Sequence, residues 1–222
     1  MPAFLDIPIS DSLVLRNASV PACLIEGLPA GTNVHDDGIA NIDIVIADGF
    51  IDALHPTGQN ATPADIDLSQ SMVWPCFADV HTHIDKGHIW PRKQNPDGTR
   101  PGALSSTAAD RAENWTTEDL RARMEFSLRC AYAHGTAAIR THLDSTAPQH
   151  KISWPVFAGL RDAWKDRITL QGVCLEPIWG YADRAFGTEI ADLMVEYTIP
   201  CRKFLIPPHM GHRGSLILIT RE

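Results

Sequence analysis

The spacing of hydrophobic positions changes near residue 72. Before it, short runs such as residues 42–46 begin with a clean apolar–polar alternation, and the Asp48-Gly49 pair separates that run from residues 50–54. Alternation is typical of a half-buried strand, and an Asp-Gly pair is typical of a tight hairpin turn. We therefore predict that residues 1–72 form short strands and turns around one β-hairpin.

After residue 72, short apolar runs that are typical of buried strands take turns with segments in which apolar residues recur at helical spacing. The predicted elements are strands at 73–80, 136–142 and 168–175, and helices at 117–134, 153–165 and 188–197. The second and third strands begin about 32 residues apart, which is the length of one βαβ unit, so we expect parallel strands. The polar stretch from 87 to 117 is predicted to be a long loop, and such loops are usually functional.

Polar residues close the first apolar run. His81 and His83 lie two positions apart, and on a strand such side chains leave the same face. Both imidazoles are therefore expected to point to one spot at the end of the strand, as they do in many zinc or iron sites. Asp85 continues the same parity and is expected to orient a ligand. A structural or surface role is the alternative for such a pair, and the spacing alone leaves it open.

Composition excludes several classes of function. The 222 residues carry a net charge of −8, and an acidic chain repels phosphate, so we expect no nucleic-acid partner. No apolar run approaches the ~20 residues that a membrane span needs, and the N-terminus lacks the pattern of a secretory signal, so we expect no membrane partner. The five scattered cysteines form no C-x-x-C pair, which predicts reduced thiols in the cytoplasm.

Two short motifs resemble a known family. Residues 75–83 are P-C-F-A-D-V-H-T-H, and residues 140–144 are R-T-H-L-D. The first is similar to the opening barrel strand of the amidohydrolase superfamily, P-G-x-x-[DE]-x-H-x-H, with Cys76 in place of the usual glycine. The second is similar to the cytosine-deaminase-like branch. The resemblance implies an α/β fold, a partial (β/α)8 (TIM-type) barrel with a small N-terminal β-sandwich portion.

The resemblance also implies a site. It makes His81 and His83 two ligands of one divalent metal ion, zinc or iron. Candidates for orienting these ligands or lining the substrate pocket are Asp85, Lys86, Trp90, Arg140, His142, Asp144 and Glu176. For His142, a structural role as a hydrogen-bonded residue at the strand end is the favoured alternative. In the family, a glutamine follows the third strand. It is missing from L-E-P-I-W at 175–179, so the resemblance does not identify which ring is the substrate. We identify no catalytic residue, because the family's general-base glutamate has no counterpart.

The barrel is expected to be incomplete. A barrel needs eight βα units, and the 150 residues from position 73 provide only three that we can assign. We predict three parts: residues 1–72 as the sandwich portion, 73–197 as the first βα units, and 198–222 as an atypical tail, out of frame or disordered. The tail contains four Lys or Arg residues and one acid. Its His209 and His212 are not expected to bind metal.

The expected function is that of a metal-dependent amidohydrolase. The reaction is hydrolytic deamination of a cytosine-like or related nitrogen heterocycle, a small-molecule substrate, and we expect the truncated chain to be inactive alone. Two alternatives remain: a ring-opening cyclic amide hydrolase, or a non-catalytic remnant that binds a partner. Three parallel units leave unpaired strand edges, which favour homo-oligomers or aggregation.

Overall fold

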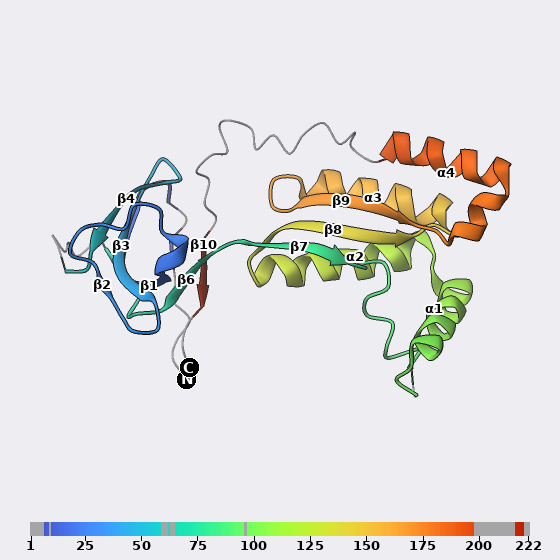
Figure 1. Ribbon diagram of the computed structural model, residues 1–222. Coiled ribbons are helices and arrows are strands. Elements are labelled where there is room, and N and C mark those ends of the chain that lie inside the picture. The colour runs from blue at the N-terminus through green and yellow to red at the C-terminus, as the bar shows by residue number, and fades with distance from the viewer. Residues whose placement is uncertain are drawn as a thin grey trace. The chain divides into compact units, whose positions relative to one another are not determined.

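The chain divides into two compact units. A computed structural model describes residues 7–8, 10–58, 62, 65–95, 97–197 and 216–219 (Figure 1). Unit 1 comprises Met1–Cys76 with Leu205–Glu222, and unit 2 comprises Phe77–Phe204. The predicted tail lies outside the described residues, His209 and His212 included, except for one strand at 216–219. Among the described residues, no helix is long and apolar enough to cross a membrane.

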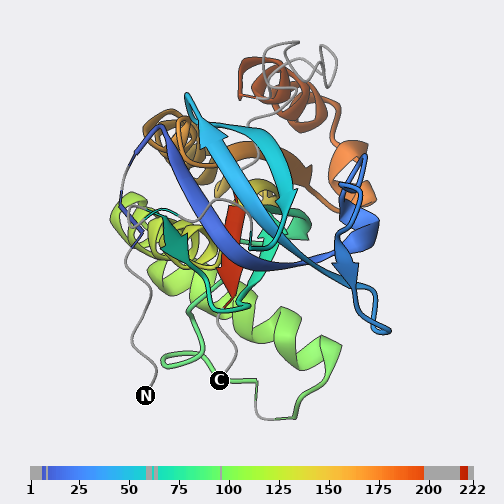
Figure 2. The same cartoon turned by 90° about the vertical axis from the view of Figure 1, so that its left-hand side faces the viewer.

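Unit 1 is a β structure built around a mixed sheet. Its elements are β1 (Leu13–Pro21), the 3-10 helix η1 (Ala22–Leu24), β2 (Asn33–Val34), β3 (Ile39–Ala47), β4 (Phe50–Pro56), β5 (Ile66–Asp67), β6 (Met72–Pro75) and β10 (Leu216–Ile219). Strand β3 pairs antiparallel with β1, β2 and β4, while β5 and β6 run parallel to β1. Figure 2 shows β1, β3 and β4 side by side. Strand β10 pairs antiparallel with β6.

The predicted hairpin is confirmed. Strands β3 and β4 pair antiparallel, with Ala47 opposite Phe50. Asp48 and Gly49 both have positive φ angles, 52° and 75°, as the tight turn that matches strand twist requires. The alternating apolar side chains of β1 and β3 form the core of this unit: Leu15, Ala18, Val20, Ala40, Ile42 and Ile44, with Leu68 and Val73.

The prediction of one buried strand at 73–80 is wrong. Strand β6 ends at Pro75 in the unit 1 sheet, and β7 (Phe77–Thr82) begins a second sheet. Proline has no backbone N–H, so it ends a hydrogen-bonded ladder. Val73 is buried in the core of unit 1, whereas Val80 is 71% exposed. The apolar run therefore serves two sheets rather than one.

Unit 2 is a parallel sheet with helices. Its elements are β7, α1 (Arg100–Asn114), α2 (Thr117–Ala133), β8 (Thr136–Asp144), α3 (His150–Trp164), β9 (Thr169–Leu175), the 3-10 helix η2 (Ile178–Ala182) and α4 (Arg184–Tyr197). Strand β8 lies in the middle and pairs parallel with β7 and β9, as predicted (Figure 1). Gly135 follows α2 with φ of 80°, the left-handed conformation with which helices commonly end.

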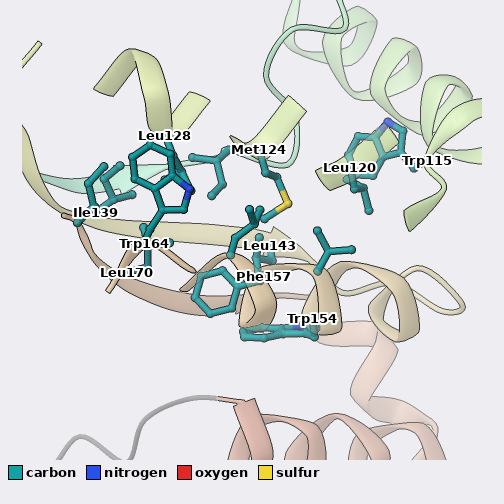
Figure 3. Close-up of a cluster of buried hydrophobic side chains, with 14 residues drawn as sticks. Trp115, Leu120, Met124, Leu128, Ile139, Leu143, Trp154, Phe157, Trp164 and Leu170 are labelled. Atoms are coloured by element: carbon teal, nitrogen blue, oxygen red, sulfur yellow. The ribbon is translucent and has the colours of Figure 1, made fainter. Parts of the chain in front are cut away.

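One face of this sheet is covered by an apolar core. Ile139 and Leu143 of β8 are buried against α2 and α3. Figure 3 shows the cluster, with Met124, Leu128 and the aromatic rings gathered around β8. Strand β9 contributes Gly172, where an added Cβ would lie 2.7 Å from the Trp154 ring, so glycine lets α3 approach the sheet closely.

One helix was not predicted, and two others begin earlier than predicted. Helix α1 occupies the stretch that was predicted to be a loop; the Thr99 hydroxyl accepts a hydrogen bond from Gly102 N at 3.1 Å at its start. Its only buried residue is Asp110, so it has no apolar stripe that the sequence pattern would reveal. Helix α2 begins at Thr117 as predicted, and the Thr116 hydroxyl before it accepts a hydrogen bond from Asp119 N at 3.2 Å. Helices α3 and α4 begin three and four residues earlier than predicted.

Candidate functional site

Three histidine rings gather at the C-terminal ends of two parallel strands. His81 is at the end of β7, His83 follows that strand directly, and His142 lies near the end of β8. The rings of His81 and His142 are stacked, with centroids 4.1 Å apart and planes at 24°. His83 lies 5.5 Å from His81 and 5.6 Å from His142, again between ring centroids. The predicted pair is thus brought together, and a third ring joins it.

The tautomer of His83 follows from one hydrogen bond. Its Nδ1 lies 3.0 Å from the backbone oxygen of His142, and a carbonyl only accepts, so Nδ1 carries the proton. Nε2 then keeps its lone pair, the form in which histidine binds metal. Burial, followed by the charge of Lys86, lowers the pKa of His83, which favours the neutral ring.

The donor set among the described residues is incomplete for a metal ion. No group of three or more His, Cys, Asp or Glu side chains in the described ranges is arranged to hold one. His83 has the chemistry of a ligand, with one nitrogen donating to a carbonyl and the other available. His81 adds a second imidazole on the exposed end of β7. A metal bound here would need donors beyond these two rings, and the ligand roles stay predictions.

Asp85 joins the two strand ends. It is fully buried, and its Oδ2 accepts a hydrogen bond from the backbone N of Asp144 at 2.8 Å. Its Oδ1 is buried with no hydrogen-bond partner. Burial raises the pKa of Asp85 to about 7, and the nearby Asp144 charge acts in the same direction. This hydrogen bond ties Asp85 to the β8 backbone, and its predicted role of orienting a metal ligand stays a prediction.

Asp144 is held by two cations. Lys86 Nζ lies 2.7 Å from Oδ1, and Arg111 Nη1 lies 2.6 Å from Oδ2. Arg111 belongs to α1, so this pair attaches that helix to the end of β8. Both oxygens of Asp144 therefore have a cationic partner from the protein, and its role in a substrate pocket stays a prediction.

Sequence reasoning missed Arg123 of α2. Its Nη1 donates to the backbone oxygens of Asp85 and, at 3.1 Å, Gly87, and its side chain is almost fully buried. Its Nε lies 2.9 Å from Asp119, and its guanidinium lies 5.0 Å from the Trp115 ring centroid. The (i, i+4) spacing to Asp119 was visible in the sequence, but the contact with the loop after β7 is long-range and was not.

The remaining candidates are Trp90, Arg140 and Glu176. Trp90 is 58% exposed. Arg140 is exposed on β8, and its Nε donates to the Gln171 side chain at 3.1 Å. Glu176 is half-buried after β9, where an added Cβ on Gly180 would collide with its carboxylate. Burial, the charge of His81 and the charge of Arg140 lower the pKa of His142. Within the described ranges, no hydrogen bond or ring stack joins Trp90, Arg140 or Glu176 to the imidazoles.

Solved structures share this fold. The chain matches N-isopropylammelide isopropylaminohydrolase from Burkholderia multivorans with a TM-score of 0.59 and 23% identity, over 85% of this chain and 44% of that one. It matches 5-methylcytosine deaminase from Klebsiella pneumoniae with a TM-score of 0.57 and 23% identity, over 73% and 36%. The mixed α/β fold is therefore shared with parts of these two proteins.

Two curated proteins are similar to this chain in sequence. No family model matches the chain. It is 49% identical over 197 residues to a pterin deaminase from Rhizobium rhizogenes (strain K84), covering 87% of this chain and 44% of that protein. It is 25% identical over 166 residues to N-isopropylammelide isopropyl amidohydrolase from Pseudomonas sp. (strain ADP), covering 72% and 37%. The chain spans less than half the length of these relatives. The predicted resemblance to the deaminases of the amidohydrolase superfamily is confirmed.

Proposed function

We propose that this chain is the N-terminal part of a metal-dependent hydrolase that deaminates a nitrogen heterocycle. Unit 2 would supply the first three strands of a (β/α)8 barrel, since β7, β8 and β9 are consecutive and parallel. Unit 1 would be the accompanying β-sandwich portion. The observation that carries the proposal is the gathering of His81, His83 and His142 at the C-terminal strand ends, where barrel enzymes carry their chemistry.

The proposed cofactor is one divalent ion, zinc or iron, held in part by His81 and His83. Such an ion lowers the pKa of bound water and so supplies a nucleophile near neutral pH. The protein's own contribution is to keep His83 neutral and oriented through its Nδ1–H bond to the β8 backbone. Asp85 and Arg123 would hold the loop that follows these ligands in place.

The proposed substrate is a ring that carries an exocyclic amino group, in the class of pterins. The 49% identity to a pterin deaminase supports this choice over a cytosine-like ring. The exposed Arg140 guanidinium lies on the same strand face as His142, where it would donate hydrogen bonds to a ring carbonyl.

The general-base glutamate and the further ligands of the family have no assigned counterpart in this chain. We therefore expect weak metal affinity and little activity from the chain alone. Strands β7 and β9 each pair only with β8 among the described residues, so association through these edges is part of the proposal.

Metal analysis of the purified chain after incubation with zinc tests this function. We expect zinc in the wild-type protein and a loss in His81→Ala and His83→Ala, but not in His55→Ala, which removes an exposed imidazole from β4. Ammonia release from pterin is expected to stay near background. Equal zinc in all four proteins would contradict the site, and turnover at ~1 s⁻¹ or faster would contradict the incomplete barrel.

A further inference from the structure

One residue of β8 contacts both predicted ligands in two different ways. The ring of His142 stacks on His81, and its backbone oxygen accepts the Nδ1 proton of His83. We propose that His142 is a positioning residue that sets the ring orientation of both ligands, His81 through its side chain and His83 through its backbone. This inference rests on the metal site of the proposed function.

His81 depends on the stack for its orientation. Its backbone N–H donates to Asp79 Oδ1 at 3.1 Å, but within the described residues its ring has no hydrogen bond. The residue is exposed, so the side chain would otherwise exchange between staggered rotamers. A flat ring 4.1 Å away at 24° restricts that exchange, because it packs against one face of the imidazole.

His83 depends on the rigidity of the strand instead. The accepting oxygen belongs to the central strand of the sheet, where His142 pairs with Val173 of β9. The next residue, Leu143, is fully buried in the core. The acceptor is thus fixed by sheet and core together, and it survives any substitution of the His142 side chain.

This difference allows a sharp test with two substitutions. His142→Ala removes the ring, whereas His142→Phe keeps a flat ring without its nitrogens; both keep the backbone oxygen. We expect His142→Ala to weaken zinc binding by the whole chain about 10-fold, the lower end for groups that orient ligands. We expect His142→Phe to bind zinc nearly as well as wild type. His55→Ala, which removes an exposed imidazole from β4 in unit 1, is the control and should bind zinc normally.

A second readout needs no metal. In the zinc-free protein, the ring-current shift of the His81 protons should be lost in His142→Ala and kept in His142→Phe, while the His83 Nδ1–H signal stays in both. An equal loss of zinc affinity in Ala and Phe would overturn the proposal, because the nitrogens of His142 would then be needed. Unchanged affinity and unchanged His81 shifts in His142→Ala would also overturn it. If the wild type binds no zinc, the proposed function fails, yet the His81 shifts still decide the stacking role.

Discussion

The two faces of the parallel sheet in unit 2 differ in how far they are buried. On β8, Ile139, Thr141 and Leu143 are buried on the side that carries α2 and α3. Arg140 and His142 alternate with them, and on that side Arg140 is exposed and His142 is only half-buried. One strand therefore contributes to a closed apolar core on one face and to an open cluster of polar rings on the other. The first holds the fold together, and the second carries the candidate site.

The strongest test of this contrast is a pair of substitutions on β8. Leu143→Ala should lower the free energy of unfolding by about 2–5 kcal/mol, because it leaves a cavity in a fully buried site. Arg140→Ala, three residues earlier on the open face, should change it by less than about 0.5 kcal/mol. Urea unfolding of both variants measures the difference. Similar losses in the two variants would mean that the open face is also packed.

Arg123 connects the covered face to the candidate site. Removing its side chain should therefore destabilise the protein nearly as much as Leu143→Ala. Arg123→Ala should lower the free energy of unfolding by about 1.5–3 kcal/mol, because the backbone oxygens of Asp85 and Gly87 lose a charged donor. Arg129→Ala on the same helix removes an exposed pair with Glu125 and should cost about 0.3–0.5 kcal/mol. Equal losses of unfolding free energy in the two variants would show that the buried contacts of Arg123 stabilise the protein no more than an exposed ion pair does.

The contrast between apolar and polar attachment extends to the helices. Helices α1 and α3 each have 15 residues, but α3 buries seven of them and α1 only Asp110. Asp110 accepts hydrogen bonds from Arg92 at 2.7 and 2.9 Å and from Trp115 Nε1 at 2.7 Å. Burial alone would raise the pKa of Asp110, but the hydrogen bonds from Arg92 and Trp115 outweigh it, so the pKa is lowered.

This lowered pKa predicts a modest dependence of stability on acid pH. The stabilisation is fully present above the unfolded pKa of about 3.9 and is lost as the pH falls through the lower folded value. Asp110→Asn cannot ionise, so its stability should fall less steeply below about pH 4 than that of wild type. Urea unfolding at several pH values measures this, with the exposed Asp162→Asn as control. Parallel pH profiles for wild type and Asp110→Asn would contradict the account.

The sequence revealed the elements with strong periodicity. The β3–β4 hairpin, α2 and the parallel strands β8 and β9 were all predictable, because alternation, helical spacing and the Gly135 end are local signals. Helix α1 was missed because it is attached by charges rather than by an apolar stripe. The apolar run at 73–80 was misjudged because period and composition do not say which sheet a strand joins, and Pro75 divides it between two.

The candidate site was predictable only in part. The H-x-H spacing placed His81 and His83 together, and the family motif added His142. The stack of His142 on His81, the burial of Asp85 and the long-range contacts of Arg123 depend on how β7, β8 and α2 meet. Such tertiary contacts leave no mark in a single sequence.

The most direct measurement of the central claim is anomalous diffraction at the zinc absorption edge from crystals of the zinc-loaded chain. We predict a zinc peak about 2.0–2.1 Å from nitrogens of both His81 and His83, beside the His142 ring on the open face of the sheet. Zinc peaks only at other positions in the crystal, with none at His81 and His83, would contradict the claim that this face is a metal site.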